Sequence, residues 1–286
     1  TYCGYDVDHV CNLTDIDDKI IARMKRDDVS LKDLTNKFAE FFFEDLDSLN
    51  IVPARCYPRA TDHVDEIVEM IDGLVKKGHA YEKDGSFYFD VGSFPSYGQL
   101  ARLDFDNMQD GAGEGGGLTD PEAFTKKNSR DFALWKAYKA EDGAVVWDTK
   151  IGKGRPGWHI ECSAMIEHTI GHGGPIDIHG GGVDLKFPHH DNELAQQEAF
   201  CNCRQTVNYF AHTGHLHIRG LKMSKSLKNF ITIRQALEGV DGLEGVRPST
   251  MRIMFCLVQY NAPCDYSDNM CRAASSLHRG RVEASS

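Results

Sequence analysis

Residues 175–215 read PIDIHGGGVDLKFPHHDNELAQQEAFCNCRQTVNYFAHTGH. Residues 176–179 predict a short buried strand, and a glycine-rich loop follows it. Residues 189–200 predict a helix, and residues 207–215 predict another strand. Strands that alternate with helices are typical of a mostly parallel sheet with covered faces. The stretch therefore predicts an α/β fold.

The flanking sequence continues this alternation. Thr14 is the expected N-cap of a first helix, with Asp17 in the capping-box position. Residues 80–150 interrupt the pattern as an expected insertion, and the run GAGEGGG at 111–117 is a surface loop because no strand precedes it. The other expected elements are a buried strand at 8–13, helices at 14–24, 31–49, 60–81, 158–170, 249–260 and 267–278, and a hairpin that turns at Asp84-Gly85.

Composition places the chain among ordinary globular proteins. It has 286 residues, a formal net charge of −11 and 41% hydrophobic residues. No run approaches the ~18 apolar residues of a membrane span, and the first residues do not show the pattern of a signal peptide. The nine cysteines are scattered without a disulfide pattern, which predicts mostly reduced thiols in a cytoplasmic protein. Residues 219–286 carry ten Lys and Arg against six Asp and Glu, so local phosphate contacts are permitted there.

Candidate metal ligands are concentrated where the histidines are. Nine of the thirteen histidines lie between residues 159 and 217. His189 and Glu193 are four residues apart and share one helix face, and with the thiolate of Cys162 they would suit zinc. Three alternatives stay open: an amphipathic helix with a polar first turn, His190 as the ligand in place of His189, and Cys162 as a small buried hydrophobic residue.

Two further motifs point to phosphate chemistry. Gly180, Gly181 and Gly182 after a strand permit close approach of a nucleotide, although a tight turn explains them equally well. The run GLKMSKSLKNF at 220–230 places Lys222 and Lys225 on a loop that can close over a polyphosphate.

With these residues the chain resembles the class I aminoacyl-tRNA synthetases, and among them the cysteinyl-tRNA synthetases. The matching stretches are NLTDIDDKI at 12–20, FALWKA at 132–137, GRPGWHIECSAM at 154–165, IDIHGGGVDLKFPHHDNELAQ at 176–196, TGH at 213–215 and KMSKSLKNF at 222–230. The form SLKNFITI is similar to eukaryotic cytosolic members, whereas bacterial members usually have glycine where Lys228 stands.

The resemblance implies a fold and an activity. The fold would be a Rossmann-like parallel sheet in residues 1–79 and 151–230, a connective insertion at 80–150 and a helical stem-contact region at 231–286. The activity would be activation of L-cysteine by ATP with Mg²⁺, followed by transfer of cysteine to the 3′ end of tRNA(Cys) in the cytoplasm. Membranes would have no part in it.

Residue roles follow by position from the same resemblance. Cys162, His189 and Glu193 match ligands of one Zn²⁺. Thr14, Trp158, His179 and Asp184 match the cysteine pocket. Gly180, Gly181, Gly182 and Lys225 match the ATP site, and Lys222 and Lys225 match the catalytic loop. Zinc would discriminate cysteine from serine because it prefers the softer sulfur ligand. A pocket that distinguishes the two amino acids by size alone would gain only ~1–3 kcal/mol of selectivity.

Two family elements are absent from the sequence. The His-Ile-Gly-His signature and the cysteine that supplies a fourth zinc ligand do not occur, and Cys3 lies too close to Thr14 to replace that ligand. We therefore expect these residues to belong to an enzyme whose N-terminal segment lies upstream. Two other functions stay open: a cysteine ligase that acts on a small amine such as an amino sugar, and a non-catalytic zinc- or nucleotide-binding remnant.

Overall fold

The computed structural model describes residues 3–103, 126–171, 174–224, 227–240 and 242–283. The chain divides into two compact units, each described here by itself. The first contains Thr1–Lys37, Ala54–His179 and Asp184–Phe210, and the second contains Phe38–Pro53, Gly180–Val183 and Ala211–Ser286. The expected GAGEGGG loop at 111–117 lies outside the described residues.

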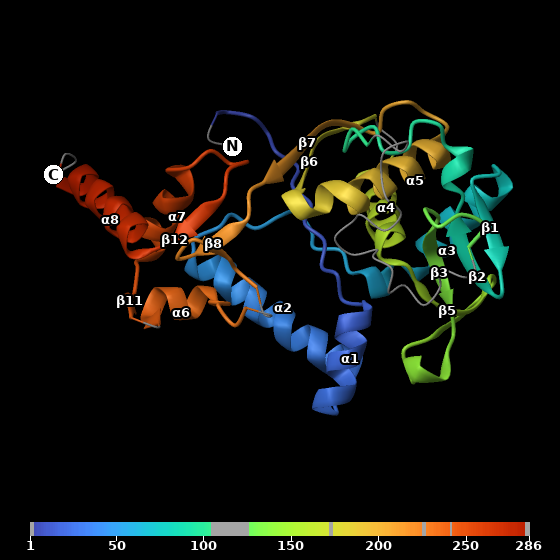
Figure 1. Cartoon of the computed structure of the whole chain (residues 1–286), viewed down its shortest axis with the longest axis horizontal. Coiled ribbons are helices and arrows are strands. Elements are labelled where there is room, and N and C mark those ends of the chain that lie inside the picture. Colours follow the sequence, from blue (N-terminus) through green and yellow to red (C-terminus); the bar gives the residue numbers. More distant parts are fainter. Residues whose placement is uncertain (1–2, 104–125, 172–173, 225–226, 241, 284–286) are drawn as a thin grey trace. The chain divides into compact units, whose positions relative to one another are not determined.

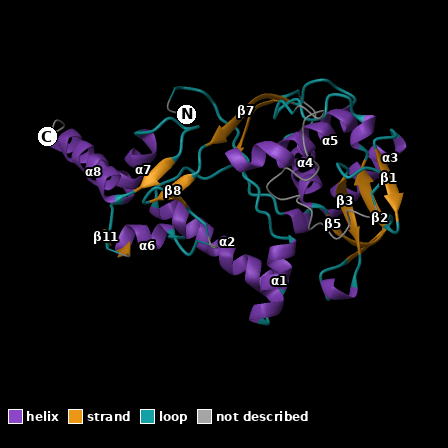
Figure 2. Cartoon of the chain, viewed as in Figure 1, coloured by secondary structure: helices purple, strands orange, loops and turns teal. Residues whose placement is uncertain are grey.

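Two helices of the first unit, α3 (Val64–Lys76) and α4 (Trp158–Thr169), pack against an antiparallel sheet (Figure 1). The other helices are α1 (Asp18–Asp27), the start of α2 (Leu31–Ser48) and α5 (Asp191–Cys201). The strands are β1 (Ala80–Lys83), β2 (Ser86–Phe89), β3 (Phe132–Ala137), β4 (Trp147–Thr149) and β5 (Gly152–Pro156), in the order β1-β2-β3-β5-β4. Figure 2 shows α4 and α5 next to each other in this unit.

The predicted hairpin is confirmed. Strands β1 and β2 pair antiparallel across Asp84 and Gly85, whose φ angles are 54° and 79°. Positive φ at both central residues suits an Asp-Gly turn, because glycine has no side chain to clash and aspartate tolerates the left-handed region.

Residues of the expected insertion at 80–150 share one hydrophobic core with α3, α4 and α5. Helix α3 lies within the helix expected at 60–81, and its apolar face is buried, since Ile67, Ile71 and Leu74 have no exposed surface. Phe89 of β2 and Trp135 of β3 are also fully buried and belong to the same cluster as this face. Residues 80–91 and 132–137 therefore help to build the core on which α4 and α5 rest.

Near the N-terminus the structure corrects two expectations. The predicted buried strand at 8–13 consists of two isolated parallel bridges, at Val10 and Leu13, and neither residue is fully buried. Helix α1 begins after Asp17 rather than after Thr14, because the Asp17 carboxylate accepts the backbone N–H of Ile20 at 2.6 Å and is itself the N-cap.

Strands β6 (Ile176–Gly182) and β7 (Val207–Thr213) form a two-stranded sheet. The expectation that residues 176–179 are buried is wrong, since 66% of Ile178 is exposed. The three glycines lie at the end of β6 rather than in a loop. A short helical turn at Lys186–His190 then leads into α5.

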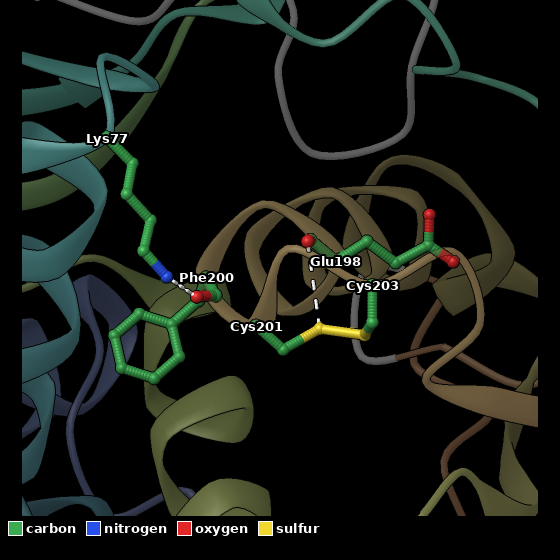
Figure 3. Close-up of a disulfide and its surroundings, with 5 residues drawn as sticks. All are labelled: Lys77, Glu198, Phe200, Cys201 and Cys203. Carbon is green, nitrogen blue, oxygen red and sulfur yellow. Dashed lines mark hydrogen bonds between the residues drawn. A yellow bond between two sulfur atoms is a disulfide. The ribbon is translucent and has the colours of Figure 1, made fainter.

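A disulfide at the C-terminal end of α5 corrects the expectation for one cysteine pair. Cys201 and Cys203 are bonded, while the other seven cysteines are free (Figure 3). Asn202 between them adopts φ 56° and ψ 40°, which ends the helix and leaves the two Cα atoms 5.3 Å apart. The last turn is also fastened to α3, because Lys77 donates a hydrogen bond to the carbonyl of Phe200.

The second unit is built from short elements around its own core. They are the rest of α2, α6 (Ile233–Glu238), α7 (Pro248–Cys256), α8 (Asp268–Glu283), β8 (Leu216–Ile218), β9 (Leu221–Lys222), β10 (Gly239–Val240), β11 (Leu243–Glu244) and β12 (Cys264–Tyr266). The two predicted C-terminal helices are confirmed as α7 and α8, which pack side by side (Figure 1). Strand β12 pairs with β8 in parallel, and β9 pairs with β8 antiparallel.

No helix among the described residues is long and apolar enough to cross a membrane.

Candidate metal site and substrate-binding residues

Two helices bring the predicted metal ligands together. Cys162 lies in the second turn of α4, and Glu193 lies in the first turn of α5. Helix α4 starts tightly against β3, because a Cβ at Gly157 would collide with the carbonyl group of Ala133. Glycine at this position therefore lets α4 approach the sheet that supports it.

The three predicted ligands form a compact buried cluster. Cys162 Sγ lies 3.5 Å from His189 Nε2, and His189 Nε2 lies 2.8 Å from Glu193 Oε1. One donor atom of each residue lies within 4.8 Å of the other two. All three side chains are buried, so the cluster is a concentration of polar donors inside the core.

Charge and burial in this cluster fit a cation. Among the described residues, both oxygens of the buried Glu193 carboxylate lack an aligned hydrogen-bond donor, although ring nitrogens of His189 and His179 are close to them. Burial opposes ionisation of Glu193, but the neighbouring His179 and His189 lower the pKa of its carboxyl group. Burial and then Glu193 raise the pKa of the Cys162 thiol, so a cation would be needed to hold the thiolate. A sulfur, an imidazole nitrogen and a carboxylate oxygen are together suited to Zn²⁺.

A second set of donors shares Glu193. His179, His190 and Glu193 also have donor atoms within 4.8 Å of one another. His179 Nε2 lies 3.1 Å from Glu193 Oε2, and the His179 and His190 rings are 4.5 Å apart. His179, predicted as a substrate contact, therefore lies against a predicted metal ligand.

Two residues beside the ligands were not predicted. His159 Nδ1 lies 2.9 Å from His189 Nδ1, within hydrogen-bonding distance. If His189 Nδ1–H is the donor, the Nε2 atom of His189 is left unprotonated. Burial and then His189 lower the pKa of His159 to about 3, so this ring is neutral. The amide of Asn12 lies 3.6 Å from Cys162 Sγ. The spacing of His159 and Cys162, three residues apart on one helix, is a signal that could have identified His159.

The other residues predicted to bind the substrate cysteine lie in different environments. The Trp158 ring lies 4.3 Å from the ring of His189, a predicted metal ligand, and is 38% exposed, so it separates that ring from solvent on one side. Thr14 is exposed and lies 3.5 Å from the Asn12 amide that also approaches Cys162. Asp184 is exposed in the short turn Val183–Leu185.

The predicted ATP-binding residues belong to the second unit. Gly181 accepts a hydrogen bond from Thr213 Oγ1 at 3.3 Å. Lys222 ends β9 and is exposed, whereas Lys225 lies outside the described residues. Asn229 bonds to the backbone on both sides of Met223, since it accepts the Ser224 N–H at 2.9 Å and donates to the Lys222 carbonyl at 3.1 Å.

Comparison with known proteins identifies the family of the chain. Residues 1–276 match the family described as tRNA synthetases class I (C) catalytic domain. A protein of Dictyostelium discoideum named cysteine–tRNA ligase, cytoplasmic, is 48% identical over 99% of this chain and 42% of its own length. A cysteine–tRNA ligase of Brachyspira hyodysenteriae is 48% identical over 92% of this chain and 53% of its own length. The chain thus spans about half the length of the curated relatives it matches.

A solved structure shares the fold at much lower identity. The methionyl-tRNA synthetase of Mycobacterium tuberculosis, bound by methionyl-adenylate, aligns with a TM-score of 0.64 and 16% identity. The alignment covers 94% of this chain and 60% of that protein.

Proposed function

The chain belongs to the family of class I (C) tRNA synthetase catalytic domains, and on that premise we propose that the protein is a cysteine–tRNA ligase. It would activate L-cysteine with ATP and transfer it to the 3′ end of tRNA(Cys). Relatives with this name at 48% identity support the proposal. They do not favour a cysteine ligase for small amines or a non-catalytic remnant.

The observation that carries the proposal is the buried cluster of Cys162, His189 and Glu193. These residues would hold one Zn²⁺, which when bound supplies a soft cation for the thiolate of the substrate. His159 would keep the Nε2 atom of His189 available by bonding to its Nδ1 atom. Trp158 would exclude water from one side of the site. Serine, with a harder oxygen in place of sulfur, would be rejected without an editing site.

The remaining predicted roles are part of the proposal. Thr14, Trp158, His179 and Asp184 would contact the substrate cysteine. Its carboxylate oxygen would attack the α-phosphorus of ATP, while the bond to the pyrophosphate oxygen breaks and cysteinyl-adenylate forms. Gly180, Gly181, Gly182, Lys222 and Lys225 would hold the ATP phosphates, with Mg²⁺ sharing the charge that accumulates on pyrophosphate.

The second unit and the location complete the proposal. The residues from 219 onward carry an excess of basic side chains, which suits contact with the phosphates of tRNA(Cys). The cytoplasm is the proposed location, and the name of the Dictyostelium relative supports it.

The experiment is pyrophosphate exchange into ATP by the full-length protein, including the expected upstream segment, with cysteine or serine as the amino acid. We expect exchange with cysteine, at least tenfold less with serine, and loss of exchange in Cys162→Ser. Cys264→Ser is the matched control, because Cys264 is another buried free thiol and lies in the second unit. The absence of cysteine-dependent exchange, or equal exchange with serine, would refute the proposal.

A further inference from the structure

A tight turn formed by residues 96–103, here called the 96–103 turn, is attached to the start of α5. The backbone N–H groups of Leu100 and Ala101 donate to the two carboxylate oxygens of Asp191 at 3.1 and 3.0 Å. The Tyr97 hydroxyl donates to Asn192 Oδ1 at 2.5 Å. Three hydrogen bonds donated by the 96–103 turn to two adjacent residues of α5 therefore join these segments.

Burial makes these bonds energetically important. Asp191 is 0% exposed and Asn192 is 1% exposed. A buried carboxylate without donors is strongly unfavourable, and bonds to a charged acceptor are about twice as strong as neutral ones. The 96–103 turn is therefore the source of the donors that let Asp191 occupy this buried position.

Asp191 and Asn192 lie between two predicted metal ligands in the sequence. His189 precedes them and Glu193 follows them, so a displacement of this segment moves both ligands relative to Cys162 on α4. Glu193 and Asp191 lie in the same first turn of α5. The hydrogen bonds to Asp191 therefore influence the distances from Glu193 and His189 to Cys162.

A chain of rings provides a second connection to the same ligand. The Tyr97 ring stacks on Phe132 at 6.3 Å, and the edge of Phe132 meets the His159 ring at 5.6 Å. His159 in turn bonds to His189. The 96–103 turn thus reaches His189 both through α5 and through packed side chains.

We propose that the 96–103 turn positions the metal site, with Asp191, Asn192 and Tyr97 as positioning residues that set the spacing of His189 and Glu193 from Cys162. The inference rests on the proposed metal site. It adds that the site depends on a segment about 60 to 90 residues away in the sequence, which contributes no ligand itself.

The test compares Asp191 with Asp131, a second buried aspartate that also accepts hydrogen bonds from a backbone segment. Asp131, 2% exposed, accepts the Val91 N–H at 3.0 Å and the Tyr81 hydroxyl at 2.7 Å, so it also holds a backbone segment and a tyrosine. Only Asp191 lies on α5. Zn²⁺ dissociation constants of Asp191→Asn and Asp131→Asn would be measured by competition with a chromophoric chelator, in the absence of cysteine, ATP and tRNA. The Co²⁺ spectrum of each variant would report whether a thiolate ligates the metal.

We expect Asp191→Asn to weaken Zn²⁺ binding at least tenfold, the usual effect of removing a group that orients a metal ligand. Asp131→Asn should stay within about twofold of the wild type, because its bonds do not touch α5. Equal dissociation constants for both variants, whether changed or not, would overturn the inference. A wild-type protein that binds no Zn²⁺ would instead refute the proposed metal site, so the two failures are distinguishable.

A gentler pair of variants keeps the test valid if Asp191→Asn does not fold. Tyr97→Phe removes only the hydroxyl that bonds to Asn192, and Tyr81→Phe removes only the hydroxyl that bonds to Asp131. Tyr97→Phe should weaken Zn²⁺ binding about threefold to fivefold, as expected for one lost hydrogen bond. Tyr81→Phe should leave the dissociation constant unchanged, and a larger effect there than in Tyr97→Phe would overturn the inference.

Discussion

Arg155 holds the strand that leads into α4, and its replacement should destabilise the first unit by a predictable amount. Its side chain is 11% exposed, and Nε lies 3.1 Å from Asp142 Oδ1, whose side chain is 7% exposed. The guanidinium also bonds to Asp18, but 63% of the Asp18 side chain is exposed. The two ion pairs of one arginine therefore have different environments.

The magnitudes follow from this difference. At an effective dielectric constant of about 20, two unit charges 3.1 Å apart attract by about 5 kcal/mol. Removing both groups from water offsets much of this attraction. Deleting Arg155 alone leaves the Asp142 charge buried and unpaired, which costs about 3 kcal/mol. The pair with Asp18 should contribute at most about 1 kcal/mol, because one partner is solvated. Arg155→Met should therefore lower the free energy of unfolding by about 3 kcal/mol.

The assay is urea unfolding of the single and double variants in a double-mutant cycle. We expect a coupling energy of about 2 to 3 kcal/mol between Arg155 and Asp142, and less than about 1 kcal/mol between Arg155 and Asp18. Asp142→Asn in the Arg155→Met background should regain part of the lost stability, because the unpaired buried charge is removed. Stronger coupling to Asp18 than to Asp142 would refute this reasoning.

Three further predictions concern the metal ligands and α5. His159→Leu should weaken Zn²⁺ binding about tenfold or more, because His189 loses the group that bonds to its Nδ1 atom; chelator competition measures this, and an unchanged constant would contradict it. Burial raises the pKa of Glu198 from 4.5 to about 7, so the folded state holds the proton more tightly and stability should fall as pH rises from 4.5 to 7. Glu198→Gln should abolish that fall and be more stable than wild type at pH 8 by about 1 kcal/mol in urea unfolding, a value reduced for solvent screening. Because Cys201 and Cys203 are bonded, a thiol reagent should react with seven of the nine cysteines in the unfolded, unreduced protein and with all nine after reduction. Reaction of all nine cysteines before reduction would exclude the disulfide.

Local patterns were the part of the structure that could be predicted from sequence. The apolar face of α3 and the Asp84-Gly85 hairpin follow from helical periodicity and turn chemistry, both of which act over a few residues. The i,i+4 spacing of His189 and Glu193 likewise predicted that their side chains meet, and they lie 2.8 Å apart. Cys162 was added through its motif and the resemblance, and the structure brings it to the same cluster.

Long-range pairing was the part that could not be predicted. The bonds from the 96–103 turn to Asp191 join residues about 90 positions apart, and no periodicity marks them. Ile178 is apolar and was expected inside, yet sequence alone does not say which face of a strand is covered. The disulfide depends on Asn202 adopting a left-handed conformation, which composition does not specify.

Lys228, in the KMSKSLKNF segment, has an unusual backbone conformation. Lys228 adopts φ 54°, the left-handed region in which a side chain costs about 1 kcal/mol relative to glycine. Glycine would adopt this conformation without that cost. The next residue, Asn229, bonds to the backbone of Lys222 and Ser224. These two hydrogen bonds stabilise the turn that contains Lys228.

The buried polar residues in the first turn of α5 are better explained by function than by their contribution to stability. Every residue from Asp191 to Ala199 is buried, including Asp191, Asn192, Glu193, Gln196, Gln197 and Glu198, so the helix is not the amphipathic one that its sequence allowed. Burying polar groups costs free energy unless each finds a partner, and apolar residues would stabilise a purely structural helix better. Asp191 and Asn192 find partners in the 96–103 turn, and Gln196 donates to Ser163 of α4. The carboxylate of Glu193 lacks an aligned donor within the described part of the chain, and it is the group that a cation beside Cys162 and His189 would satisfy.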